Sequence, residues 1–157
     1  MRCKKIKPKP GRFVIVRPLI TAVCNGMEAL KLKSILIIEN DEDLLQLMQD
    51  IFNDAGYDVH GRPQVNDISS LVRELQPDAI LLDYLLPGIN GGELCAQLKR
   101  DPETMHLPVV LCSAYPQVLL SLGSYGCNAF IAKPFDVADL IAQVEDCIAN
   151  PERILLL

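Results

Sequence analysis

A strict alternation of strand-like and helix-like segments, from Ser34 to residue 149, constrains the fold of this chain more than any other feature. The runs SILII (Ser34–Ile38) and AILL (residues 79–82) are almost wholly apolar, as expected for parallel strands that are covered on both faces. Three further strand-like segments cover residues 57–60, 107–112 and 128–132. The alternation predicts the α/β class, with a doubly wound five-stranded parallel sheet and five helices.

The predicted helices have an apolar face at helical spacing and polar or helix-breaking residues at their ends. Asp41 caps the first helix, Ala55 and Gly56 end it, and Asp136 caps the last. The apolar face of the first helix consists of Leu44, Leu45, Leu47, Met48, Ile51 and Phe52. The other helices are predicted over residues 65–75, 93–100 and 118–122, the last with a weak pattern.

Charge divides the chain into unequal parts. Residues 1–33 carry nine Lys or Arg and one acid, whereas residues 34–157 carry six Lys or Arg and nineteen acids. We expect residues 1–33 to be a basic extension that is disordered or stems from a misplaced start, since Met27 lies just before the domain. Residues 34–149 form the predicted domain, and residues 150–157 an apolar tail that packs on the domain or forms a dimer contact. The acidic domain argues against a direct nucleic-acid partner.

The six cysteines show no CxxC pair and no metal-ligand spacing, so we expect reduced, mostly buried thiols in a cytoplasmic protein. No apolar run approaches the roughly 18 residues that a membrane span needs, so no membrane contact is expected. Residues 13–24 are apolar after a basic stretch, but Arg17 and Pro18 interrupt them, which argues against a signal peptide.

Polar side chains stand at the ends of four predicted strands. Glu39 and Asn40 follow the first, Asp83 the third, Ser113 the fourth and Lys133 the fifth. Right-handed crossovers bring the carboxyl ends of parallel strands to one edge, where open α/β sheets bind their ligands. The sequence therefore predicts one small cleft that contains carboxylates, a hydroxyl and an ammonium group.

A family resemblance is carried by the segments ILIIENDEDLL, PDAILLDYLLPGINGGEL, PVVLCSA and NAFIAKPF, which lie between residues 33 and 148. With the spacing of Asp83, Pro87, Gly88 and Gly91, and the later Lys133-Pro134-Phe135, the chain resembles the receiver domain of two-component response regulators. The resemblance implies the flavodoxin-like receiver fold.

The resemblance also implies a role for each residue of the cleft. Asp83 is the expected phosphoacceptor, and a sensor histidine kinase or a histidine phosphotransfer protein is the expected donor. Glu39, Asp83 and the backbone carbonyl of Leu85 are the expected Mg²⁺ ligands. Lys133 and Ser113 are expected to contact phosphoryl oxygens. Such a protein catalyses its own phosphorylation but is not a turnover enzyme.

The expected output is a change of shape. Ser113 moves toward the phosphoryl group, Phe130 changes rotamer, and the face made by the fourth helix, fifth strand and fifth helix is altered for a downstream protein. Phe130 has an alternative as a packed core residue. Because only residues 150–157 follow the last helix, we expect a stand-alone receiver, as a monomer or a weak homodimer.

Asn40 departs from the family pattern, in which two acids usually stand at this point. Its amide oxygen can bind Mg²⁺ or one of its waters, but the site lacks one negative charge. Two readings stay open: Mg²⁺ binds more weakly, or the domain signals without phosphorylation. Leu85 and Tyr115 are bulky residues that would hinder attacking water, which predicts a long-lived phosphoform.

Three other functions fit less well. A haloacid-dehalogenase-type phosphatase needs a second aspartate two residues after the first, where this chain has Leu85. A flavin-mononucleotide binder needs a phosphate loop where this chain has acids. A serine hydrolase needs a histidine, and His60 and His106 are expected away from the cleft.

Overall fold

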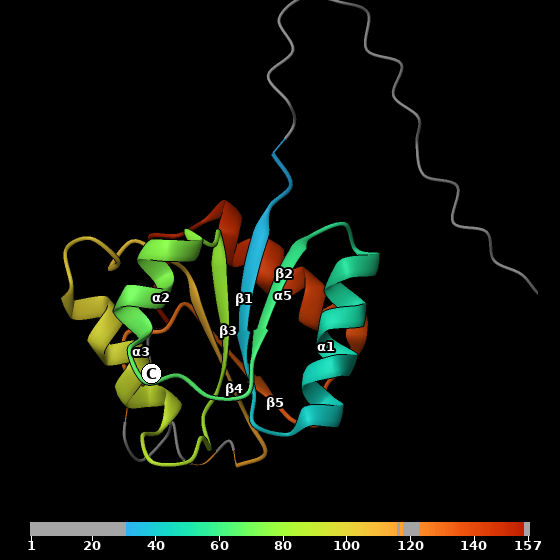
Figure 1. The fold of residues 1–157 in the computed structure, drawn as a ribbon, viewed down its shortest axis with the longest axis horizontal. Coiled ribbons are helices and arrows are strands. Elements are labelled where there is room, and N and C mark those ends of the chain that lie inside the picture. Colours follow the sequence, from blue (N-terminus) through green and yellow to red (C-terminus); the bar gives the residue numbers. More distant parts are fainter. Residues whose placement is uncertain (1–30, 116, 118–122, 156–157) are drawn as a thin grey trace, which may run out of the picture. The chain divides into compact units, whose positions relative to one another are not determined.

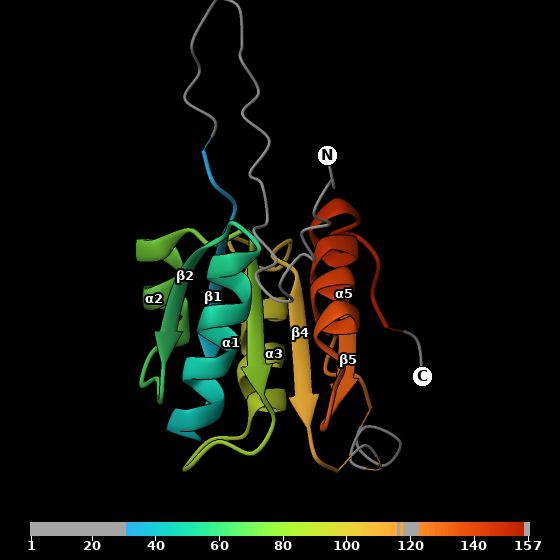
Figure 2. The same ribbon diagram turned by 90° about the vertical axis from the view of Figure 1, so that its right-hand side faces the viewer.

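One parallel sheet of five strands forms the centre of the part of the chain that the computed structural model describes, residues 31–115, 117 and 123–155. The strand order is β2-β1-β3-β4-β5, and every neighbouring pair is parallel (Figure 1). The strands are β1 Ser34–Ile38, β2 Asp58–Arg62, β3 Ala79–Asp83, β4 Val109–Ser113 and β5 Ala129–Ala132. The predicted sheet is therefore confirmed, and the carboxyl ends of its strands share one edge (Figure 2).

Four helices lie in the described part of the chain. They are α1 Glu42–Asp54, α2 Ile68–Leu75, α3 Gly91–Arg100 and α5 Val137–Ala149. Helices α1 and α5 cover one face of the sheet, and α2 and α3 cover the other (Figures 1 and 2). The predicted helix over residues 118–122 and residues 1–30 of the predicted basic extension fall outside the described residues.

Each of these helices begins at an acidic or amide side chain that accepts hydrogen bonds from the first turn. The caps are Asp41, Asp67, Asn90 and Asp136. Asp67 and Asn90 also explain two differences from the predicted boundaries: α2 begins at residue 68 instead of 65, and α3 at residue 91 instead of 93.

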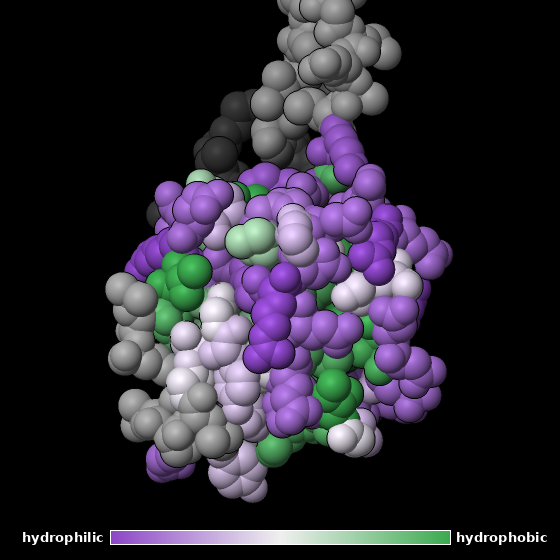
Figure 3. Space-filling view, turned by 90° about the vertical axis from the view of Figure 1, so that its left-hand side faces the viewer, coloured by the Kyte–Doolittle hydropathy of each residue, from purple (hydrophilic) through white to green (hydrophobic). Residues whose placement is uncertain are grey.

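Apolar side chains fill both sides of the sheet. On the α1 and α5 side, strand residues such as Ile35 and Leu81 pack with Phe52 and Val144. On the other side, residues such as Leu36 pack with side chains of α2 and α3. The surface on the α2 and α3 side is mainly hydrophilic, with apolar patches that are small and separate (Figure 3). Because both faces of the sheet are covered by apolar packing, the carboxyl edge of the sheet is where a ligand could bind.

The segment after α5 returns to the start of β5. The amide nitrogen of the Asn128 side chain donates to the carbonyl oxygens of Pro151 and Arg153, at 2.7 and 2.8 Å. The backbone N–H of Leu155 donates to Cys127 O at 2.9 Å, and the Leu155 side chain packs against the core. Up to residue 155, the tail therefore packs on its own domain, one of the two predicted alternatives.

The cysteines of the described chain, Cys95, Cys112, Cys127 and Cys147, are free and buried, as predicted. Burial raises the pKa of the Cys95 and Cys127 thiols to about 12, which keeps both thiols protonated near neutral pH. No helix in the described part of the chain has the length and hydropathy of a membrane span.

Candidate functional site

The site lies at the carboxyl ends of β1, β3 and β5, where an ammonium group joins two carboxylates. Lys133 Nζ donates to Glu39 Oε2 at 2.6 Å and to Asp83 Oδ1 at 2.5 Å. The two acidic side chains are 3% and 5% exposed, and that of Lys133 is 17% exposed. The structure thus brings Lys133 together with Glu39, which is 94 positions away in the sequence, and with Asp83, which is 50 positions away.

Local structure fixes both carboxylates. The other oxygen of Asp83, Oδ2, accepts from the backbone N–H of Leu85 at 2.9 Å, and Glu39 Oε1 accepts from the N–H of Asp41 at 3.2 Å. Each carboxylate therefore has one hydrogen bond to its own loop and one to Lys133. This arrangement holds the acids in a fixed orientation before any ligand binds.

Burial and charge oppose each other in this site. Burial raises the pKa of Glu39, with a further contribution from the charge of Asp83, although the hydrogen bond from Lys133 lowers it. For Lys133, burial lowers the pKa, but the hydrogen bonds to Asp83 and Glu39 outweigh it and raise the pKa. One cation faces two anions, so the site carries an excess of negative charge that favours a second cation.

Ser113 ends β4 beside this cluster and is fully buried. Its Oγ accepts from the N–H of Tyr115 at 3.0 Å, and its carbonyl oxygen accepts from the backbone N–H of Lys133 at 2.8 Å. Ser113 is therefore next to the Lys133 backbone, although among the described residues its hydroxyl makes no hydrogen bond to the side chain of Lys133 or Asp83.

The donor set suits Mg²⁺, because it consists of oxygen atoms that include two buried carboxylates. Asn40 is exposed and adjoins Glu39, and Leu85 is exposed two residues after Asp83. Within the described residues, no group of three or more His, Cys, Asp or Glu side chains is placed to hold a metal ion. A metal here would therefore depend on amide, carbonyl and water oxygens in addition to Glu39 and Asp83.

Phe130 lies on β5, opposite Leu111 of β4, and is partly buried against the core on the α2 and α3 side. It lines a groove of about 560 Å³ between β5, α5 and the tail, together with Ala142 and Leu155. The predicted switch residue thus reaches the surface while it contacts the core.

An apolar groove of about 380 Å³ adjoins the site on the α1 side, and the sequence had not indicated it. It is lined by Leu44, Leu47, Ala114, Lys133, Pro134 and Phe135. Leu47, predicted on the apolar face of the first helix, is 52% exposed here. The sequence did contain a sign of this exposed apolar surface. The apolar residues Leu44, Leu45, Leu47 and Met48 cover a wider arc of the helix than one buried face requires.

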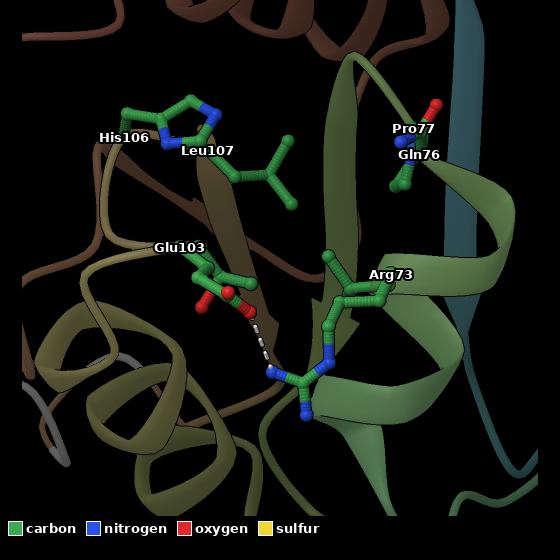
Figure 4. A pocket seen from close by; sticks show the side chains of 8 residues that line it. Arg73, Gln76, Pro77, Glu103, His106 and Leu107 are labelled. Atoms are coloured by element: carbon green, nitrogen blue, oxygen red, sulfur yellow. Dashed lines mark hydrogen bonds and ion pairs between the residues drawn. The ribbon is translucent and has the colours of Figure 1, made fainter.

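Another cleft, of about 570 Å³, lies at the other end of the sheet (Figure 4). It separates the end of α2 from the connection between α3 and β4, and two of its lining residues, Arg73 and Glu103, pair across it at 3.1 Å. His106 lines this cleft, away from Asp83, as predicted. Glu103 and Thr104 also line this cleft, but among the described residues Glu103 is hydrogen-bonded to Arg73 and Thr104 to the carbonyl of Leu98, and neither is hydrogen-bonded to His106.

Comparison with known proteins gives a consistent result. The family model of the response regulator receiver domain matches residues 35–145. The chain is 31% identical over 122 residues to the polar-differentiation response regulator DivK of Brucella anthropi, covering 75% of this chain and 98% of DivK. It is 34% identical over 122 residues to the DNA-binding dual master transcriptional regulator RpaA of Synechocystis, covering 76% of this chain. The chain spans about half the length of RpaA, 51%.

Solved structures agree on the fold. A putative response regulator from Chloroflexus aurantiacus matches with a TM-score of 0.71 and 27% identity, over 76% of this chain and all of that one. The receiver domain of sensor histidine kinase PA1611 from Pseudomonas aeruginosa, with a magnesium ion in its active-site cleft, matches with a TM-score of 0.66 and 24% identity, over 76% and 99%. The chain belongs to the response regulator receiver domain family.

Proposed function

We propose that the domain accepts a phosphoryl group on Asp83 from a histidine kinase or a histidine phosphotransfer protein, and signals through a change in its protein-binding surface. The observation that carries this proposal is the bridge from Lys133 to both Glu39 and Asp83 at the ends of three strands. The likeness to the response regulator DivK, over 98% of that protein, supports the same class of signalling.

In the proposed reaction, a carboxylate oxygen of Asp83 attacks the phosphorus atom of a phosphohistidine. The new O–P bond forms as the P–N bond breaks, and the leaving imidazole takes up a proton. Lys133 has three donor protons, of which two contact Glu39 and Asp83, so the third can reach a phosphoryl oxygen. Ser113 is the proposed second contact, through its hydroxyl.

Glu39, Asp83 and the carbonyl of Leu85 are the proposed Mg²⁺ ligands, with Asn40 as an additional oxygen donor. When bound, Mg²⁺ neutralises the charge that collects on the phosphoryl oxygens. The protein itself positions the two carboxylates, because the loop N–H groups of Leu85 and Asp41 donate to them.

The apolar groove beside Lys133 is the proposed docking surface for the donor. A donor that delivers phosphate to Asp83 must rest close to it, and this groove offers Leu44, Leu47 and Phe135 beside Lys133. An amphipathic helix that carries the phosphohistidine suits such a groove, because its apolar face can cover these side chains.

The output surface is proposed to include Phe130 and the groove between β5 and α5. Phe130 contacts both the core and this groove, so a change in its rotamer would alter the groove. A downstream protein that recognises the altered groove would then distinguish the two states.

The proposal is tested by intact mass after incubation with Mg²⁺ and acetyl phosphate. We expect one phosphate adduct in the wild-type protein, none in Asp83→Ala, and a normal adduct in Asp43→Ala, an exposed acid near the start of α1. No adduct at any Mg²⁺ concentration, together with an adduct in Asn40→Asp, would instead support the phosphorylation-independent alternative. Equal adducts in wild type and Asp83→Ala would refute the proposed acceptor.

A further inference from the structure

Two tyrosines connect the residue after Asp83 to the segment that precedes β5. Tyr84 directly follows Asp83, and its hydroxyl lies 3.2 Å from the hydroxyl of Tyr125. The two ring centroids are 6.1 Å apart. Neither side chain takes part in the proposed phosphoryl transfer.

The main chain at Tyr84 is held on both sides. Its N–H donates to Cys112 O at 2.8 Å, and its carbonyl oxygen accepts from the N–H of Gly91 at 2.9 Å. The residue is only 5% exposed. A displacement of its ring would therefore be transmitted to the backbone on either side, which carries Asp83 and Leu85.

Tyr125 adopts a conformation that side chains normally avoid. Its φ of 53° lies in the left-handed region, which is unfavourable by roughly 1–2 kcal/mol for a residue other than glycine. Its carbonyl oxygen accepts from the Cys95 thiol at 3.6 Å. Such a conformation persists only where the surroundings impose it, and residues of this kind concentrate at functional sites.

The ring of Tyr125 explains the second glycine of the Gly91-Gly92 pair. A Cβ atom on Gly92 would lie 2.6 Å from Cε2 of Tyr125, so no side chain fits beneath the ring. A Cβ atom on Gly91 would instead collide with the carbonyl oxygen of Asp83. Gly92 thus makes room for Tyr125, and Gly91 for the main chain at the acceptor.

The contact between the hydroxyls of Tyr84 and Tyr125 is partly buried. Tyr125 also packs against the same buried cluster as Phe130. The pair thus joins the acceptor segment to the cluster that supports β5.

We propose that Tyr125 is a positioning residue for the phosphoacceptor site: its hydroxyl holds the phenol of Tyr84 and so fixes the main chain from Asp83 to Leu85. This inference rests on the proposed function of Asp83. It predicts that loss of the Tyr125 hydroxyl loosens this segment before any metal or phosphate is bound.

The first test is amide hydrogen exchange in the metal-free protein, read at Leu85 and Gly91. Tyr125→Phe keeps the ring and removes the hydroxyl, so exchange at both amides is expected to rise roughly three- to tenfold. Tyr57→Phe removes the hydroxyl of another buried tyrosine, at the amino end of β2 and away from the site, so it is the matched control and should change neither amide. Tyr84→Phe should match Tyr125→Phe, and the double variant should add little.

Unchanged exchange at these amides in Tyr125→Phe would overturn the proposal. So would an equal rise throughout β1, because that would mean a general loss of stability.

The second test measures the initial rate of phosphorylation by acetyl phosphate while Mg²⁺ is varied. Tyr125→Phe is expected to need several-fold more Mg²⁺ than the wild type for the same rate, whereas Tyr57→Phe should need the same concentration as the wild type. Equal Mg²⁺ requirements in wild type and Tyr125→Phe would overturn the positioning role. A wild-type protein that takes up no phosphate would overturn the proposed function instead, while the exchange test still decides whether Tyr125 holds the main chain.

Discussion

Two partly buried lysines, at opposite ends of the same sheet, have opposite surroundings. Lys133 lies at the carboxyl ends of the strands and binds two carboxylates. Lys99 lies near the start of β4 and binds three neutral oxygens: the carbonyls of Met105 and Leu107 and the side chain of Asn128, at 3.2, 2.7 and 2.9 Å. Burial lowers the pKa of Lys99, whereas carboxylates raise that of Lys133.

The two lysines distinguish the edge proposed for phosphoryl transfer from an edge at which the lysine is fully hydrogen-bonded. At Lys99 every donor proton has an acceptor, and Asn128 extends the network to Val109 and to the tail. At Lys133 two buried acids share one cation, an arrangement that stability alone does not favour. The edge that holds the proposed site therefore carries an excess of negative charge, whereas at the other edge Lys99 has balanced hydrogen bonds.

Lys133→Met should give the largest effect on stability. It leaves the carboxylates of Glu39 and Asp83 buried without a cation, so we expect a loss of about 3–5 kcal/mol in the free energy of unfolding at neutral pH. The loss should shrink as the pH falls, because the orphaned acids then bind protons in the folded state. Urea denaturation at neutral and mildly acidic pH measures both effects. A loss that is independent of pH would contradict the claim that Lys133 compensates two buried acids.

Lys99→Met should cost less. It leaves three neutral acceptors without their donor, which corresponds to about 1–3 kcal/mol. Since no acid is orphaned, the loss should be equal at neutral and mildly acidic pH. The same denaturation series measures this, and a loss that depends on pH as it does in Lys133→Met would show that the two edges do not differ as described.

Glu39→Gln should stabilise the metal-free protein, by on the order of 1 kcal/mol at neutral pH, because Lys133 keeps Asp83 as a partner. The folded-state pKa of Glu39 is raised, so its ionisation disfavours folding above that pKa. The gain should therefore disappear as the pH falls toward 4.5, the ordinary value. Glu42→Gln, an exposed acid on α1, is the control; a destabilised Glu39→Gln would contradict the excess of charge.

Asn40→Asp concerns the same excess of charge and should have a smaller effect, on ligand binding. One more carboxylate beside Glu39 should lower the Mg²⁺ concentration needed for phosphorylation by roughly tenfold at most. Asn53→Asp, at the far end of α1, controls for added charge. If wild type and Asn40→Asp need the same Mg²⁺ concentration, the amide is not the weak point of the site.

The smallest expected effect concerns the lifetime of the phosphoform. Leu85 and Tyr115 are both exposed beside the site, at 48% and 57%. Tyr115→Ala should open a path for water and shorten the lifetime several-fold, measured as loss of the phosphate adduct with time. A lifetime equal to that of the wild type would mean that Tyr115 does not shield the acceptor.

Much of the fold could be predicted from the sequence, because the informative patterns are local. The runs at β1 and β3 were predicted where they occur, and Asp41 and Asp136 were predicted as caps. The start of α3 was missed, because Asn90 followed by two glycines resembles a loop while Asn90 in fact caps the helix.

The site could be predicted only in part. Glu39, Asp83 and Lys133 could be predicted because they follow strands of a parallel sheet, whose carboxyl ends lie at one edge. The contacts of Tyr84 with Tyr125, and of Lys99 with Asn128, could not be predicted. They join residues 41 and 29 positions apart whose meeting depends on side-chain packing, which no periodic pattern encodes.

The central claim is that the negative edge exists to carry a phosphoryl group on Asp83, and one measurement tests it most directly. Protein incubated with Mg²⁺ and acetyl phosphate is treated with borohydride, which reduces an aspartyl phosphate to homoserine, and its peptides are then sequenced by mass spectrometry. The account predicts homoserine at position 83, and only after incubation with acetyl phosphate. Phosphate uptake without homoserine at position 83, or with homoserine at another aspartate such as Asp41, would contradict it.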